Sequence, residues 1–425
     1  MAGMTTQGTQ RGNHRAALIV ALGLAVMFVA ATLLTPLYPL YQRSFRFSEV
    51  TLTLVYAIYV LGNLGALFFF ARLSDQAGRR FIVWPAIGIA LASTLAFGLA
   101  TGIAWLFVGR ALSGFATGLA SSAMAAWIAE LQPQGGSQAG AVIASAANFT
   151  GLAVGPWFGA VPAQLGLYPL HLPFAFYVAV LVATGIALSR VPETVGHPRQ
   201  HLRELSLRPR FGVPKDIFAS FVSPAVTAFL TFALFGFYAA LIPGLLAHAL
   251  KETRPVVTAL VVCVLFAVAA VVTPLTSRVP SRTAMLCGLG LFPPAAILLV
   301  MAEHGQSMAL LIIASILAGG AGSLGYRGSL AVVNRISPED RRGEVVATYL
   351  IMMFCGNSLP VIGIGLLSSK AGAAVAHIAF AALIAVLAIL GLVVGWRYAP
   401  DDGKARRRTA ASSDSSPPRT TRHTA

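Results

Sequence analysis

The stretch Ala16–Leu40 reads AALIVALGLAVMFVAATLLTPLYPL and contains no charged residue. A helix needs about 20 apolar residues to cross a hydrocarbon layer about 30 Å thick. The apolar region of a secretory signal peptide is shorter, roughly 7–15 residues. Arg11 and Arg15 precede the stretch, and Ala30-Ala31 imitates a cleavage site. The length nevertheless predicts an uncleaved first membrane-spanning helix.

Similar apolar runs recur along the rest of the chain, separated by short polar loops. Together they predict an all-α polytopic membrane protein with twelve transmembrane helices. The predicted spans are residues 16–40, 48–70, 81–101, 104–130, 138–160, 171–190, 216–243, 255–277, 281–301, 307–333, 343–367 and 373–396.

The composition supports this class. Of 425 residues, 57% are hydrophobic and only 10% are charged, and the mean hydropathy is +0.77. Soluble domains usually carry about 25% charged residues. The surplus apolar surface must therefore face lipid.

The distribution of Lys and Arg predicts the orientation. Five of the 30 lie in loops that would be external if both termini are cytoplasmic, and two lie within helices, which leaves 23 inside. Cytoplasmic loops carry the excess of positive charge in membrane proteins. We therefore expect a multi-pass protein of the cytoplasmic (inner) membrane with both termini in the cytoplasm.

The positions of the basic residues and of the cysteines argue against a nucleic-acid-binding protein and against a disulfide-rich or metal-binding one. The net charge is +16, but the basic residues lie in short loops without interleaved aromatic residues, so nucleic-acid binding is not expected. The three cysteines, Cys263, Cys287 and Cys355, lie far apart inside apolar segments. They predict neither a disulfide framework nor a metal site.

The predicted domains are two six-helix bundles joined by a basic loop. A weak internal repeat supports the duplication: Glu130–Pro133 is followed by Gly151 as Arg335–Pro338 is followed by Gly356. Duplicated halves are typical of secondary transporters. The segments are 1–15 (N-terminus), 16–190 (first bundle), 191–215 (basic cytoplasmic loop), 216–396 (second bundle) and 397–425 (basic disordered tail).

The loop after the second span reads ARLSDQAGRR over Ala71–Arg80. It resembles the signature of the major facilitator superfamily, whose usual form is Gly-x-Leu-Ala-Asp-Arg-x-Gly-Arg-Arg/Lys. The sequence departs from that form at Ala71 and Gln76. Helix count, central loop and motif position fit the family over essentially the whole chain.

Four residues of this loop also have an expected physical role that does not depend on the resemblance. Gly78 permits a turn with positive φ, and Arg79 and Arg80 anchor the loop inside. Asp75 is suited to lie against the positive N-terminus of a neighbouring helix. The resemblance implies that this neighbour is the eleventh helix and that the contact holds the outward-open state. The alternative is a solvated loop whose charges only set topology.

Glu130, at the inner end of the fourth span, is expected to pair with Arg79, as in the charge network that the resemblance implies. An exposed pair of this kind contributes at most about 1 kcal/mol. The alternative role is again topology and solvation.

Arg110 lies within the fourth span and is followed by Gly114 and Gly118. A charged Arg at the bilayer centre costs about 2.5–3.5 kcal/mol on the gentlest scale, so it should face protein or water. The two glycines form a small-residue face that lets another helix approach. The resemblance implies that Arg110 handles protons or substrate charge; the alternative is an Arg that snorkels to the outer surface.

The fifth span contains Gly151, Gly155, Pro156 and Gly159. Pro156 should kink the helix, and the glycines allow close packing or sliding. This pattern resembles the antiporter motif of the drug:proton branch of the superfamily, with Ala160 where a second Gly is common. It implies export rather than uptake.

Coupling residues are harder to assign. Arg327, in the tenth span, is a candidate for coupling or substrate charge, or it reaches the inner surface. All 14 acids lie in loops or at helix ends, so proton coupling would use Asp75, Glu130, Glu49, a histidine such as His171 or His248, or the substrate. Residues that could line a central path are Asn63, Asn148, Asn357, Tyr38, Tyr56, Tyr59 and Tyr349.

The sequence thus predicts a secondary active transporter of the superfamily type that exports a small molecule by alternating access, with proton exchange as an open option. The alternative is a proton-coupled or facilitated importer of a sugar or organic acid. An embedded enzyme or a passive channel lacks supporting motifs, and no ATP-binding loop is found. We expect a monomer in the lipid bilayer, with no cofactor and no metal.

Overall fold

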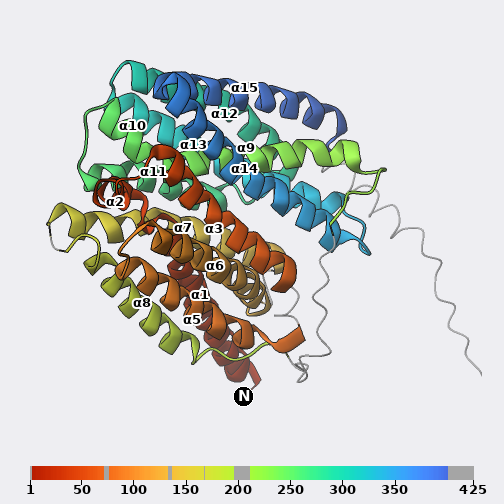
Figure 1. The fold of residues 1–425 in the computed structure, drawn as a ribbon. Coiled ribbons are helices and arrows are strands. Elements are labelled where there is room, and N and C mark those ends of the chain that lie inside the picture. The colour runs from red at the N-terminus through yellow and green to blue at the C-terminus, as the bar shows by residue number, and fades with distance from the viewer. Residues whose placement is uncertain (1, 71–75, 133–135, 167, 196–210, 401–425) are drawn as a thin grey trace, which may run out of the picture.

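The structure, a computed structural model, describes residues 2–70, 76–132, 136–166, 168–195 and 211–400, and the side chains of 2–12 and 136–138 are left aside. The regular elements of these residues are all helical (Figure 1). The N-terminal half contains α1 (Ala2–Leu33), η1 (Thr35–Leu37), α2 (Tyr38–Phe45), α3 (Glu49–Phe70), α5 (Arg79–Gly98), α6 (Ile103–Glu130), α7 (Gly136–Gln164) and α8 (Leu172–Leu188).

The C-terminal half follows the same plan. Its elements are α9 (Phe218–Ala240), α10 (Ile242–His248), α11 (Pro255–Leu275), α12 (Ser281–His304), α13 (Met308–Ile336), α14 (Arg342–Ala371) and α15 (Ala373–Tyr398).

The predicted fold class is confirmed. Within the described residues, 11 helices are long and apolar enough to cross a membrane, and Leu172–Leu188 is a shorter apolar helix. This helix corresponds to the sixth predicted span. The chain is a multi-pass membrane protein.

Two predicted spans are interrupted near one end. The first breaks after Leu33 and continues as η1 and α2, and the seventh breaks at Leu241 and continues as α10. Pro36 lies in the first turn of η1 and Pro243 in that of α10. A proline lacks the N–H that would continue the preceding helix but fits a first turn. At the other end of the first span, α1 extends back to Ala2 through the predicted N-terminal segment.

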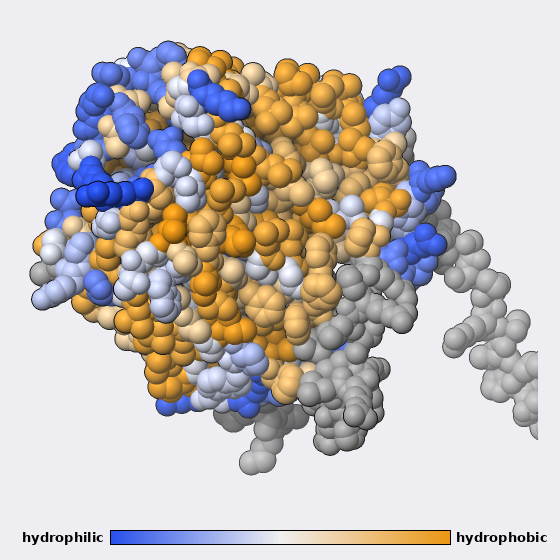
Figure 2. All heavy atoms as spheres, viewed as in Figure 1, coloured by the Kyte–Doolittle hydropathy of each residue, from blue (hydrophilic) through white to orange (hydrophobic). Residues whose placement is uncertain are grey.

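The surface explains how the helices meet lipid. A broad apolar belt covers the side of the bundle, with polar residues gathered at its two ends (Figure 2). Large side chains such as Leu18, Trp84, Ile389 and Val393 are exposed by 43% or more. In water such a surface would be unfavourable, whereas in a bilayer it is the expected exterior.

Each half has a large core, and the two halves meet along two pairs of helices. Figure 1 shows α1–α8 on one side and α9–α15 on the other. α3 lies along α14, and α7 lies along α11. A third cluster of buried residues crosses this interface, with Tyr59 and Val60 of α3 against Val345 and Tyr349 of α14.

The two ends of the bundle are named from the predicted orientation. The outer end carries α2 and α10, which contact each other. The inner end carries the loop before α5. At the outer end, the Thr35 hydroxyl donates to the carbonyl oxygen of Ala239 at 2.8 Å, so the halves touch there as well.

Candidate functional site

Arg110 of α6 is the most deeply buried cation in the part of the chain that the structure describes, with a side chain 0% exposed. One guanidinium N–H donates to the carbonyl oxygen of Ala31 at 3.1 Å, and another donates to the Tyr38 hydroxyl. The side chain therefore faces protein, and it does not snorkel to the outer surface.

Three tyrosine rings surround this guanidinium. Its Cζ atom lies 5.7 Å from the ring centre of Tyr38, 5.4 Å from that of Tyr56 and 5.5 Å from that of Tyr59. A cation over an aromatic face within about 6 Å gains roughly 0.5–2 kcal/mol. We call Arg110 with these three tyrosines the arginine cage.

The cage leaves part of the charge unsatisfied. Among the described residues, no carboxylate bonds Arg110, and its Nε atom has no hydrogen-bond partner. A buried charge is costly when it is not paired. The site therefore favours a ligand that brings a negative charge or a hydrogen-bond acceptor.

The cage also reaches the C-terminal half. The Tyr56 hydroxyl donates to Oδ1 of Asn357 in α14 at 3.1 Å. Asn357 itself is buried, with 7% of its surface exposed. A change in the spacing of α3 and α14 would therefore alter the position of Tyr56 beside Arg110.

Arg327, the second predicted charge, is placed elsewhere. Its two terminal nitrogens donate to the carbonyl oxygen of Val279 at 3.3 and 3.2 Å, in the loop between α11 and α12. The structure does not bring Arg327 to the arginine cage. This geometry supports a role in holding that loop, and its role in coupling stays a prediction.

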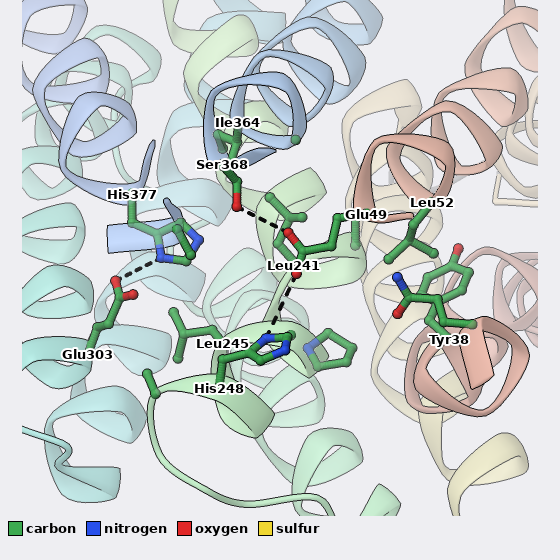
Figure 3. A pocket seen from close by; sticks show the side chains of 17 residues that line it. Tyr38, Glu49, Leu52, Leu241, Leu245, His248, Glu303, Ile364, Ser368 and His377 are labelled. Carbon is green, nitrogen blue, oxygen red and sulfur yellow. Dashed lines mark hydrogen bonds and ion pairs between the residues drawn. The ribbon is translucent and has the colours of Figure 1, made fainter. Parts of the chain in front are cut away.

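A cavity of about 170 Å³ lies between the halves at the outer end. Figure 3 shows Glu49 of α3 directed at Ser368 and His248, and His377 directed at Glu303. Glu49 accepts from the Ser368 hydroxyl at 3.1 Å and lies 3.8 Å from Nδ1 of His248. Tyr38 lines this outer cavity as well as the arginine cage.

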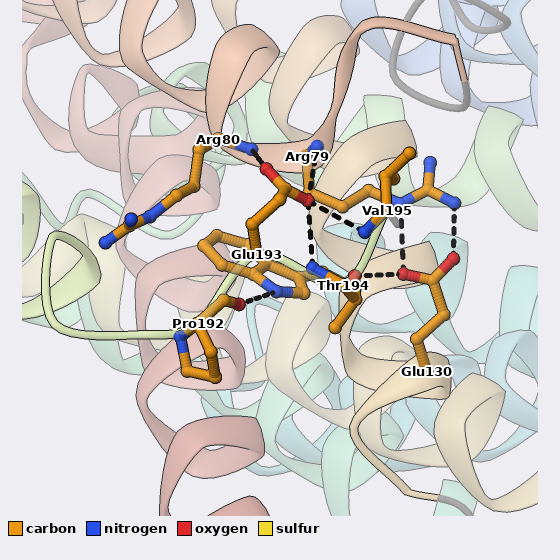
Figure 4. A network of polar contacts seen from close by, with 8 residues as sticks. Arg79, Arg80, Glu130, Pro192, Glu193, Thr194 and Val195 are labelled. Carbon is orange, nitrogen blue, oxygen red and sulfur yellow. Dashed lines mark hydrogen bonds and ion pairs between the residues drawn. The ribbon is translucent and has the colours of Figure 1, made fainter. Parts of the chain in front are cut away.

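A second polar network lies at the inner end (Figure 4). Arg79 donates through Nε to Oε2 of Glu130 at 3.2 Å and through a terminal nitrogen to Oε1 at 2.5 Å. The Arg79 side chain is only 6% exposed, against 36% for Glu130. The hydroxyl of Thr194 also donates to Glu130. The structure thus brings together two residues that the sequence paired.

Glu193 was not among the predicted residues, although it organises this network. Its carboxylate accepts from the backbone N–H groups of Arg79 at 3.0 Å and Arg80 at 2.9 Å, at the start of α5. Partial burial raises the pKa of Glu193, but the N–H donors of Arg80, Arg79, Val195 and Thr194 outweigh it and lower the pKa. The only signal for Glu193 in the sequence is its position as an acid just after the sixth span. The start of α5, which its carboxylate contacts, lacks a side-chain cap, so a negative charge there is favourable.

Gly78 is required by the same network. Its φ is +107°, and a Cβ atom there would lie 3.1 Å from a Glu193 oxygen. Arg80 donates to the carbonyl oxygen of Ser189, which fixes the loop against the end of α8.

Asp75 lies outside the described residues, so its predicted contact with the start of α14 is a proposal. The elements that it would join do lie together. Leu64 and Leu67 of α3 pack on the cluster that contains Val345, near the start of α14.

The predicted glycines lie at close helix contacts. A Cβ atom on Gly114 would come within 2.0 Å of the Tyr59 carbonyl oxygen, and one on Gly118 within 2.7 Å of the Ala66 Cβ, both in α3. On α7, Gly151, Gly155 and Gly159 lie in the same way against α1, and Pro156 is inside the helix. The neighbours of these faces belong to the same half of the molecule.

Comparison with known proteins agrees with this architecture. A bacterial homologue of the human lysosomal transporter Spinster, solved in an inward-facing and unoccupied conformation, is similar with a TM-score of 0.67 at 16% identity, over 91% of this chain and 98% of that one. "Multidrug resistance protein 2" of Bacillus subtilis (strain 168) is 25% identical over 185 residues, which is 43% of this chain and 46% of that protein.

The sequence profile described as the Major Facilitator Superfamily matches residues 20–279 and 224–423, and so extends over both halves. Together with the two sets of membrane-spanning helices and the described interface between them, this match identifies the family. The chain belongs to the major facilitator superfamily.

Proposed function

We propose that this protein exports a small amphiphilic molecule by alternating access, and that the arginine cage binds the acidic or hydrogen-bond-accepting group of that molecule. The single observation that supports this most is the fully buried guanidinium of Arg110 beside the interface of the halves, which has no carboxylate partner among the described residues. Aromatic walls suit the apolar part of such a molecule, and the cation suits its polar part.

Export is favoured over import by the pattern of α7. Gly151, Gly155 and Gly159 lie against carbonyl or hydroxyl oxygens of α1, beside the kink-forming Pro156. This is the pattern that resembles the antiporter motif. The similarity to a Bacillus protein named for multidrug resistance supports the same direction.

The proposed movement is a rocking of the two halves about α3–α14 and α7–α11. Asp75 would latch the inner end in one state, with Arg79, Glu130 and Glu193 holding the loop in place. The predicted orientation puts this inner end, and both termini, in the cytoplasm of a cell with the protein in its inner membrane. Exchange for protons would supply the energy.

The test is a retention assay. Cells that overproduce the protein should retain less of some members of a panel of anionic and zwitterionic fluorescent dyes than cells with an empty vector. Arg110→Lys should reduce this efflux about tenfold, because lysine keeps the charge but loses the planar, stacking fork. Arg15→Lys, at an exposed position of α1, is the matched control.

Two results would contradict the proposal. One is an Arg110→Lys variant that is present at wild-type level and exports at the wild-type rate. The other is faster net uptake of the dyes in overproducing cells, which would favour the importer.

A further inference from the structure

The outer cavity contains a buried acid–base pair that the arginine cage does not use. Nδ1 of His377 in α15 lies 2.7 Å from Oε2 of Glu303 in α12, and the two side chains are 6% and 9% exposed. The ring of Phe237 in α9 packs edge-on against the His377 ring, with centroids 5.2 Å apart. Both members of the pair line the cavity.

Such a pair is a natural place for one proton. Histidine is the side chain whose ordinary titration falls between about pH 5 and 8. A buried carboxylate is stabilised by an imidazolium at hydrogen-bond distance, and the buried pair with a neutral imidazole carries one net negative charge. Uptake of one proton by the imidazole turns the pair from net negative to net neutral, with no other reactant.

The opposite wall of the cavity carries a second carboxylate, Glu49, which the charge of the pair can repel. Glu49 belongs to the N-terminal half, and its side chain is 40% exposed. It bonds Ser368 and approaches His248, both of the C-terminal half. Contact across this cavity therefore includes the approach of the Glu49 carboxylate to the C-terminal half.

Three further charged or titratable groups near the cavity make contacts of their own. Lys251 donates to the carbonyl oxygen of His248 at 2.9 Å, and Arg254 pairs with Glu252 at 2.6 Å. His304, next to Glu303, donates from Nδ1 to the carbonyl oxygen of Val300 in its own helix. The cavity itself is thus lined by two carboxylates, Glu49 and Glu303, and two imidazoles, His248 and His377. Glu303 belongs to α12 and His377 to α15.

We infer that the Glu303–His377 pair is a proton-binding site filled from the outer cavity, and that its proton lets the two halves close over that cavity. Without the proton, the negative pair and Glu49 repel each other, and the outer end opens. With the proton, the repulsion is removed and the Glu49–Ser368 contact forms. The inference rests on the proposed alternating access and supplies a site for its proton exchange.

The experiment measures proton binding and closure without any substrate. The full chain, with Cys263, Cys287 and Cys355 replaced by serine, carries spin labels at Ser44→Cys in α2 and Ala371→Cys in α14, two exposed positions at the outer ends of the two halves. Distances between the labels are measured in lipid nanodiscs from about pH 5 to about pH 8, the range in which a histidine titrates.

The expected result is a longer distance at high pH, with a single titration step. Glu303→Gln and His377→Gln should each remove this step. Glu49→Gln should reduce its amplitude, because the group that senses the pair is neutral. His304→Gln, which changes the exposed neighbouring histidine, should leave the curve unchanged.

Proton binding is observed directly by following the His377 ring resonance, assigned as the signal that His377→Gln removes. If a single substitution prevents folding, the double variant Glu303→Gln/His377→Gln keeps a hydrogen bond between α12 and α15 and takes its place. A His377 signal that does not titrate, or a distance step that survives the double variant, would overturn the inference. A failure of the export assay would leave these readouts intact.

Discussion

The two halves of the molecule are built on the same contacts but carry different charges. In the N-terminal half, Gly114 of α6 lies against the carbonyl oxygen of Tyr59 in α3; in the C-terminal half, Gly319 of α13 lies against that of Leu265 in α11. Gly151 of α7 meets Ala25 of α1 as Gly356 of α14 meets Phe229 of α9. The packing follows the internal repeat.

The charged residues do not follow it. One turn before Gly114 stands Arg110, whereas one turn before Gly319 stands Ser315, which bonds the Tyr238 hydroxyl at 3.2 Å. The buried Glu303–His377 pair lies in the C-terminal half. The two halves thus share helix packing, while Arg110 and the Glu303–His377 pair each occur in one half only. Substitutions in the two halves can test this division between shared packing and separate chemistry.

The largest effect should come from the shared glycines. Gly114→Val and Gly319→Val should both abolish folded protein, because a Cβ atom would come within 2.0 and 2.3 Å of a backbone oxygen. Overpacking of this kind costs about 1–3 kcal/mol or more. Gly320→Val is the matched control, since a Cβ there meets nothing within 4 Å. The measurement is the yield of monodisperse protein in detergent; an effect in one half alone would break the comparison.

The next effect should be specific to one half. Arg110→Ser gives the N-terminal half the residue that the C-terminal half has at the matching position. Dye efflux should fall at least tenfold, while thermal stability stays the same or rises, because an incompletely paired buried charge is removed. Thermal unfolding and efflux are measured on the same variant. A large loss of stability would mean that Arg110 is structural.

A smaller effect is expected at the inner network. Gly78→Ala places a Cβ at φ +107°, 3.1 Å from Glu193. A strained backbone of this kind costs about 1–3 kcal/mol. Glu130→Gln removes the ion pair with Arg79 and should cost about 1 kcal/mol, because Glu130 is partly exposed. Thermal unfolding of both variants, compared with Gly65→Ala, checks the order.

The smallest effect is a dependence on acid pH. The pKa of Glu193 is lowered in the folded protein, so its contribution is complete above the ordinary glutamate pKa and is lost as pH falls through the lowered value. Between about pH 6 and pH 3, the wild type should lose more thermal stability than Glu193→Gln. Equal losses in the two proteins would show that the α5 cap does not depend on this charge.

Most of the architecture can be predicted from the sequence, because every span must be long and apolar enough to cross the bilayer. Ala16–Leu40 and the later runs could be read without a structure for that reason. The breaks after Leu33 and at Leu241 were missed, since Pro36 and Pro243 are tolerated inside many membrane helices and only neighbouring packing decides whether a new helix begins.

The site was predictable in its parts and not in its assembly. Arg110 and the three tyrosines are all candidates from the sequence. The tyrosines come from α2 and α3, however, and no periodicity within one helix shows that they meet at Arg110 in α6. Glu303 and His377 are 74 positions apart, so each looked like an ordinary residue near a helix end. Contacts between helices decide such sites, and they leave no local pattern.

The bond from Tyr56 to Asn357 has a thermodynamic consequence for the whole cycle. Because one wall of the arginine cage is tethered to the opposite half, any ligand that prefers the tethered cage must also stabilise the Tyr56–Asn357 bond. By reciprocity, this bond must raise the affinity for that ligand by the same factor. Ligand binding and the relative position of the two halves are then coupled in one equilibrium.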